Sequence, residues 1–174
     1  AIYPDNTMDY FGTFAIAAEN AIQIKKDTLL TISLSLTLIL LILFFYYKKI
    51  LIPIYFFLPA IFGSTFAIGV MGFLKQEISA ISLATGAVMI GIIVAYSFHF
   101  FTHLRHTRSI SITIKEISAP LLTGSFTTIT ALAALCFTNS EVLQDFGLFA
   151  ALSLSGAAIF TLIGLPVILQ LFSF

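Results

Sequence analysis

The sequence predicts an all-α membrane protein, a five-transmembrane-helix bundle with a short amphipathic N-terminal segment. Of the 174 residues, 59% are hydrophobic and only 9% are charged, and the mean hydropathy is +1.08. Soluble domains carry roughly a quarter charged residues, so this chain has too few polar side chains to cover a surface in contact with water. The lipid bilayer is therefore its expected solvent.

Five segments contain no Asp, Glu, Lys or Arg, and each reaches the roughly 20 residues that a helix needs to cross the hydrocarbon core. The charged residues lie between these segments, and most of the gaps are very short. Consecutive helices should therefore run antiparallel as tight hairpins. The predicted spans of the transmembrane bundle, which occupies residues 28–174, are residues 28–47, 50–74, 78–104, 117–140 and 146–174.

Residues 1–27 differ from the rest of the chain because they mix charged and apolar side chains. Residues 3–6 are typical of a turn, and large apolar residues such as Phe11 and Ile22 alternate with polar ones up to Lys26. The segment is either an amphipathic helix on the outer membrane surface or the end of an extracytoplasmic domain. The chain begins at Ala1 without the pattern of a signal peptide, so we expect it to be part of a longer protein.

The basic residues predict the orientation, because cytoplasmic loops carry the excess of Lys and Arg. Five basic residues follow the first and third spans, and three lie on the opposite side. We therefore expect the N-terminal segment and the loops at 75–77 and 141–145 outside, and the C-terminus inside. The five are Lys48, Lys49, Arg105, Arg108 and Lys115, and the three are Lys25, Lys26 and Lys75.

Small residues and histidines recur every four residues in the third span, which places them on one helix face. Ala87, Gly91 and Ala95 form a small-xxx-small pattern that allows another helix to approach closely. His99 and His103 continue this face. Tyr96 borders it, about 100° around the helix from Ala95.

The fourth and fifth spans carry polar and small residues as well. Four threonines lie within residues 123–130, and their hydroxyls bond either to their own helix or to a neighbour. We expect at least one to reach a neighbour. Gly147, Ala151 and Ser155 make a second small-residue pattern in the fifth span, and Pro166 should kink or end that helix near the inner face. The threonines are Thr123, Thr127, Thr128 and Thr130.

Several classes of function are disfavoured by the composition. Eight basic residues balance eight acidic ones, which gives no basic surface for nucleic acid. The lone Cys136 forms no internal disulfide or multi-cysteine metal site. His99, His103 and His106 are spaced like metal ligands on one helix, as in membrane di-iron enzymes, but those sites use many more histidines, and no carboxylate lies in a predicted span. We therefore predict no metal, no cofactor and no enzymatic activity.

Together these motifs resemble the resistance-nodulation-division (RND) permeases, most closely their lipid-exporting branch (mycobacterial membrane protein large, MMPL) and the related sterol-sensing domains. The segment Gly91–His99 resembles the fourth helix of that family, which usually has an aspartate where this chain has Ala95. The likeness continues from Ala119-Pro120 to Thr127-Thr128, and it includes Phe146-Gly147 at the start of the sixth helix and Leu165-Pro166 near its end. The chain would then form helices two to six of one half of a transporter.

The resemblance implies a proton-driven exporter of hydrophobic or amphiphilic, lipid-like molecules in the bacterial inner membrane. Its partners would be membrane lipids, the hydrophobic substrate and a second homologous half or another copy of the chain. The relay around the Ala95 position would be lined by Tyr96, His99, Thr127 and Thr128. The missing acid could be supplied by the other half, replaced by His99, or lost. A membrane module that senses lipids or sterols without transport is the alternative.

Overall fold

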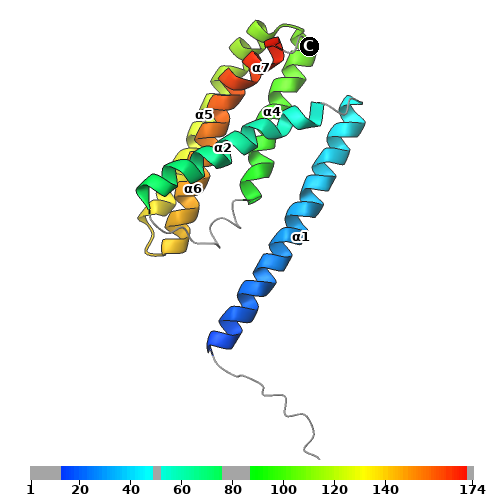
Figure 1. Cartoon of the computed structure of the whole chain (residues 1–174). Helices are drawn as coiled ribbons and strands as arrows, with labels where there is room; N and C mark the ends of the chain where they lie inside the picture. The colour runs from blue at the N-terminus through cyan, green and yellow to red at the C-terminus, as the bar shows by residue number, and fades with distance from the viewer. Residues whose placement is uncertain (1–12, 49–51, 76–86, 172–174) are drawn as a thin grey trace, which may run out of the picture. The chain divides into compact units, whose positions relative to one another are not determined.

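The structure is a computed structural model that describes residues 13–48, 52–75 and 87–171 (Figure 1). Every regular element in these described residues is a helix, which confirms the all-α class. Four helical stretches are long and apolar enough to cross a membrane, as expected of an integral membrane protein. They are Ile22–Tyr47, Pro53–Leu74, Ile110–Phe137 and Glu141–Leu171.

The span predicted at residues 78–104 corresponds to α4 (Ala87–Thr107). Its first part lies outside the described residues, so the full length of this span stays a prediction. The described helix runs beyond the predicted end at residue 104 and carries Arg105 and His106 in its last turn.

The chain divides into two compact units, one up to Ile39 and one from Leu40 onwards. The described part of the first unit is the larger part of α1 (Thr13–Tyr47), whose apolar side chains, such as Leu34, are exposed. The helix passes through residue 28 without a break. Residues 13–27, for which we predicted a separate amphipathic lead-in, therefore share one helix with the first span.

The second unit is organised by α2 (Ile52–Leu74) and α6 (Glu141–Ile159), which make the most extensive contact between helices. Their backbones touch where they cross. A Cβ atom placed on Gly156 would lie 3.2 Å from the Cα of Gly63, and one placed on Gly63 would overlap the backbone oxygen of Ser153. Such close approach favours association in lipid, where van der Waals packing replaces the hydrophobic effect. Ala60, Ala67 and Ala157 are the buried small residues nearby.

Helix α4 packs against both α2 and α6. Met89 and Ile93 are buried in a cluster with alanine and leucine side chains of those two helices. Ser97 is fully buried, and its Oγ donates a hydrogen bond to the backbone oxygen of Phe56 at 3.0 Å. Phe56 lies three residues before Pro59, which has no backbone N–H to donate within α2. The serine is thus a polar link inside an apolar interface.

The last turn of α1 belongs to the second unit and packs there through aromatic side chains. The ring of Tyr47 lies 5.4 Å from that of Phe56 and 6.4 Å from that of Phe101. Its hydroxyl lies 3.5 Å from the hydroxyl of Thr102 on α4. Aromatic pairs at these distances add to the free energy of packing beyond the area they bury.

Helix α5 (Ile110–Ala133) begins earlier than the span predicted at residues 117–140. Residues 105–116, which lie between the third and fourth predicted spans, are thus mostly helical, because only Arg108 and Ser109 separate α4 from α5. Hydropathy marks the part of a helix that tolerates lipid, whereas backbone hydrogen bonding continues into its polar ends. Arg108 ends α4 with a left-handed φ of 53° and donates its N–H to the oxygen of Leu104, the pattern of a helix terminator.

A short 3₁₀ turn, η1 (Ala134–Phe137), follows α5 and precedes α6. The predicted outer loop at residues 141–145 forms the start of α6 instead. Glu141 and Asp145 thus belong to the helical stretch Glu141–Leu171, as Glu116 belongs to Ile110–Phe137, so the apolar helices extend into charged residues that the predicted spans left out. An exposed polar turn and the first turn of a helix have similar compositions, since acidic residues stabilise helix N-termini.

The last helix continues beyond Ile159 as a π turn, η2 (Phe160–Gly164), and then as α7 (Leu165–Leu171). The irregularity predicted at Pro166 takes the form of this π turn just before the proline, and the helix runs on to Leu171. A proline in a helix cannot donate to the preceding turn and crowds the carbonyl four residues earlier. The wider π turn relieves both problems.

The α2–α6 crossing predicts a difference between two glycines of one helix. Gly63→Ala should lower the free energy of unfolding by about 1–3 kcal/mol, because its methyl group would overlap the backbone of α6. Gly69→Ala should be neutral or stabilising by up to about 1 kcal/mol, since no atom lies within 4 Å of its Cβ position. Denaturation in detergent micelles measures both changes. Equal effects would contradict the close crossing.

Candidate functional site

A cavity of about 280 Å³ lies between α4 and α5 and contains two of the predicted site residues, Tyr96 and His99. Ala95, next to them in sequence, is exposed and does not line it. No carboxylate contributes to the lining itself, and the carboxylate of Glu116 lies 3.3 Å from one lining side chain, His103. The lining residues are Tyr96, His99 and His103 from α4, and Ile117, Pro120, Leu121 and Gly124 from α5.

Tyr96 connects the two walls of this cavity. It is half-buried, and its hydroxyl lies within side-chain hydrogen-bonding range of the buried Ser125 of α5. Ser125 Oγ donates its own hydrogen to the backbone oxygen of Leu121 at 2.5 Å. Because a hydroxyl has one hydrogen and two lone pairs, Ser125 accepts the hydrogen of Tyr96. Hydrogen bonds of this kind hold neighbouring helices together in lipid.

The predicted relay threonines face elsewhere. Thr127 and Thr128 both donate to the backbone oxygen of Gly124, at 2.9 and 3.0 Å. Thr123 and Thr130 likewise donate to carbonyls of α5 itself. The bond across helices that we expected from a threonine comes from Ser125 instead. Neither Thr127 nor Thr128 lines the cavity of Tyr96 and His99.

The predicted small-residue face of α4 meets no neighbour in the described part of the chain. Gly91 and Ala95 are exposed, and no atom lies within 4 Å of a Cβ placed on Gly91. The side chain of Ala87 lies outside the described residues. Helix α4 instead buries the opposite face, which contains Met89 and Ile93. Close packing at Gly91 would therefore require a partner helix beyond the described chain.

The small residues predicted on α6 do pack closely. A Cβ atom on Gly147 would lie 2.5 Å from the backbone oxygen of Leu132 and 2.7 Å from the Cβ of Leu135. Ala151 is 8% exposed. These contacts fix α6 against the end of α5 and η1.

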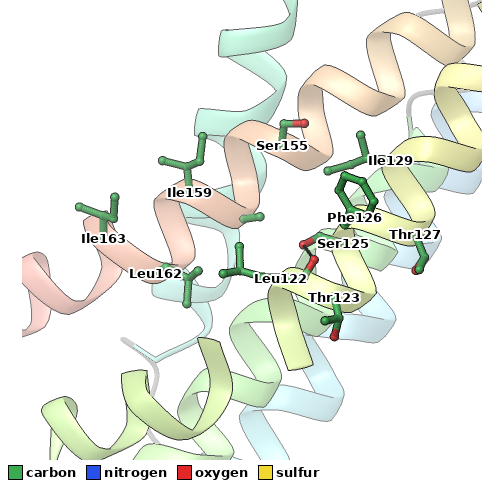
Figure 2. A pocket seen from close by; sticks show the side chains of 11 residues that line it. Leu122, Thr123, Ser125, Phe126, Thr127, Ile129, Ser155, Ile159, Leu162 and Ile163 are labelled. Carbon is green, nitrogen blue, oxygen red and sulfur yellow. Dashed lines mark hydrogen bonds between the residues drawn. The ribbon is translucent and has the colours of Figure 1, made fainter. Parts of the chain in front are cut away.

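A larger apolar groove of about 730 Å³ lies between α5 and the rod formed by α6 and η2 (Figure 2). Figure 2 shows Leu122 and Phe126 on the α5 side and Ile159 and Ile163 on the other. Hydroxyls in its lining are already bonded, since Ser155 donates to the backbone oxygen of Ala151 at 2.7 Å. The groove therefore offers an apolar surface. Its other lining residues are Thr123, Ser125, Thr127, Ile129, Ala158 and Leu162.

Sequence reasoning missed an ion pair between Lys75, just after α2, and Asp145 of α6. The side chain of Asp145 is only 8% exposed, and that of Lys75 is 36% exposed. A carboxylate removed from water requires a partner of opposite charge. The sequence contains one indication of this ion pair. Lys75 is the basic residue of one predicted outer loop, and Asp145 is the last residue of the other, so opposite charges are expected on the same side of the membrane.

The histidines are divided between two surfaces. His103 Nδ1 lies 3.3 Å from Glu116 Oε2, and His103 also borders a separate pocket that contains His106. Among the described residues, no group of three His, Cys, Asp or Glu side chains lies close enough to hold a metal ion. His99 and His106 do not line the same cavity.

The ion pair predicts that two acidic residues of α6 differ in how much their neutralisation lowers the free energy of unfolding. Asp145→Asn should lower the free energy of unfolding by about 1–3 kcal/mol, because a buried partner of Lys75 is lost. Glu141→Gln, at an exposed position one turn earlier, should change it by about 0.5 kcal/mol or less. Chemical denaturation of both variants in the same detergent provides the measurement. A similar small effect of the two would show that the ion pair does not stabilise the bundle.

The Tyr96–Ser125 hydrogen bond predicts a second contrast. Tyr96→Phe and Ser125→Ala should each cost about 0.5–1.5 kcal/mol, and the double variant should cost less than the sum of the two. Thr127→Ala is the control, because its hydroxyl bonds only to its own helix. Thermal unfolding in detergent checks all four proteins. Additive losses in the double variant would mean that the two side chains are energetically independent.

Comparison with known protein families, curated proteins and solved structures finds no match for this chain.

Proposed function

We propose that this chain is part of the transmembrane domain of a proton-driven exporter of hydrophobic or amphiphilic molecules, related to the RND permeases. The observation that carries the proposal is the apolar groove of about 730 Å³ between α5 and the α6–η2 rod. Both walls belong to helices that are able to cross a membrane. A molecule with a long apolar part would leave the lipid phase and enter the groove without passing through water.

The π turn η2 supports a ligand-handling role for the groove. Ile163 and Leu162 lie in this turn and form part of the lining. Such turns interrupt regular helix hydrogen bonding and often occur at functional sites. The groove thus lies beside the least regular part of the last span.

The proton-carrying acid is assigned to a second homologous half. The cavity with Tyr96 and His99 is lined by no carboxylate. The exposed face with Gly91 and Ala95 is narrow and lacks a described neighbour, so it suits close contact with a helix of that half. In this arrangement Tyr96 and His99 would provide hydrogen-bonding groups beside an acid contributed from across the interface.

A second candidate is a membrane module that senses lipids or sterols without transporting them. The observation that favours it is the absence of an acid from the cavity lining, together with Ala95 where the RND permeases usually have an aspartate. Such a module would bind an apolar ligand in the same groove. It would not respond to a proton gradient.

Transport across vesicles distinguishes the two functions. We expect the full-length protein that contains this chain together with the second half, reconstituted in liposomes, to move a fluorescent lipid analogue when a pH gradient is imposed. The movement should stop when a protonophore removes the gradient. Ser155→Phe should slow this movement severalfold by filling the groove. Ala131→Phe is the matched control, since this exposed α5 residue does not line the groove.

Saturable binding of the analogue without gradient-driven movement would contradict the exporter and favour the sensing module. Equal rates for Ser155→Phe and Ala131→Phe would exclude the groove from the pathway. Helix content by circular dichroism confirms that each variant is folded before it is compared.

A further inference from the structure

A second polar pocket, of about 420 Å³, lies where α1 and α4 end. Tyr46 from the last turn of α1 forms one wall, and residues from the last two turns of α4 form the other. The pocket is separate from the groove and from the cavity of Tyr96 and His99, with which it shares only His103. Its lining consists of Tyr46, Thr102, His103, Arg105 and His106.

The side chains of this pocket are held in place by specific contacts. The Arg105 guanidinium lies 5.6 Å from the centre of the Tyr46 ring, a cation–π geometry that orients the charge. The Tyr46 ring in turn lies 5.9 Å from that of Phe98. The guanidinium therefore has a defined position at the wall of the pocket.

The charge around the pocket is positive. Arg105 and His106 are joined by Lys48 and Arg108, which directly follow α1 and α4 and are exposed. The described carboxylate at this end of the second unit is Glu116, which faces His103. Glu141 and Asp145 lie beyond the far end of α5, roughly 36 Å away along a 24-residue helix. An anion entering the pocket would meet Arg105 without a competing acid on the pocket wall.

The position of the pocket favours a lipid headgroup over a free ion as the anion that binds there. Arg105 and His106 occupy the end of an apolar helix, the level at which lipid headgroups lie. Beside Tyr46, the α1 side chains Ile42 and Phe45 are 57% and 73% exposed. An acyl chain can lie along these residues while the phosphate occupies the pocket, whereas a free phosphate ion would gain nothing from them.

We propose that this pocket binds the phosphate headgroup of an anionic phospholipid, with Arg105 as the main contact. The guanidinium donates paired hydrogen bonds to phosphate oxygens. Thr102 and Tyr46 offer hydroxyls, and His106 adds a second nitrogen donor. This site is distinct from the apolar groove, with which it shares no residue, and its main contact, Arg105, does not line the cavity of Tyr96 and His99.

The test measures lipid binding to the purified whole chain in a neutral detergent by native mass spectrometry. The probes are dioleoyl phosphatidylglycerol and dioleoyl phosphatidylcholine, which differ in headgroup charge but have the same acyl chains. We expect phosphatidylglycerol to bind more tightly. Arg105→Gln should weaken its binding about fivefold, as expected for one cation near a charged headgroup.

Two further variants separate a pocket from general surface charge. Lys115→Gln removes one charge at the same end of the second unit from an exposed α5 residue outside the pocket, and should leave binding nearly unchanged. Arg105→Lys keeps the charge and should retain more binding than Arg105→Gln. Circular dichroism confirms that all variants keep their helix content.

Three results would overturn the proposal. Equal binding of the two lipids would remove the headgroup preference. Equal losses for Arg105→Gln and Lys115→Gln would indicate a diffuse charge effect. Displacement of phosphatidylglycerol by millimolar inorganic phosphate would assign the pocket to a soluble anion.

Discussion

The backbones of α2 and α6 meet at Gly63 and Gly156, and this contact determines where the other helices lie. Because the two helices cross without intervening side chains, their surfaces form one continuous platform for α4. Ile93 of α4 packs there against Ala60 and Ala157. The same crossing directs the start of α6 towards the end of α2, where Lys75 meets Asp145. Without it, the buried carboxylate would have no described cation beside it.

Polar groups between the helices of the second unit fall into two kinds, those that link two helices and one without a partner in the described part of the chain. Ser97 bonds to the carbonyl of Phe56, and Tyr96 bonds to Ser125, so each joins two helices. Ser153 is fully buried at the crossing, and its hydroxyl has no hydrogen-bond partner among the described residues. A larger apolar residue would not fit there. The unpaired hydroxyl of Ser153 carries an energetic cost in this packed interior.

The sequence was a good guide to where apolar helices lie and a poor guide to where helices end. Runs without charge located the spans, because charged side chains are costly in hydrocarbon. They placed Asp145 in a loop and began α5 near residue 117, since hydropathy detects lipid tolerance and not backbone hydrogen bonding. Small-residue spacing identified Gly91 and Gly147 alike, yet only Gly147 has a close described neighbour. Spacing defines a face but does not say whether a helix occupies it. Gly63 lies three residues after Ala60 and four residues before Ala67, so the three residues do not share a strict four-residue pattern.

The candidate site was predicted in part for the same reason. Tyr96 and His99 share a cavity because residues three apart lie on one side of a helix, which sequence shows directly. Which residue of α5 contacts Tyr96 depends on how α5 is rotated about its axis. The positions of hydroxyl residues in the sequence do not tell whether Ser125 or Thr127 faces α4. The resemblance to RND permeases gives the order of the motifs along the chain, but it does not tell how α5 is rotated about its axis.

The π turn at Phe160–Gly164 changes the direction in which the following side chains of the last helix point around its axis. Buried residues follow one another at intervals of four along this rod, from Asp145 to Leu169. In a regular α-helix each such interval advances by about 40°, so a stripe of this length would wind around most of the rod and leave the platform. The wider turn takes back part of that rotation. The wall residues Ser155, Ile159 and Ile163 keep the same interval across it. One irregular turn thus reduces the winding of the packed stripe and of the groove wall around the rod. The members of the buried stripe are Asp145, Phe149, Ser153, Ala157, Thr161, Leu165 and Leu169.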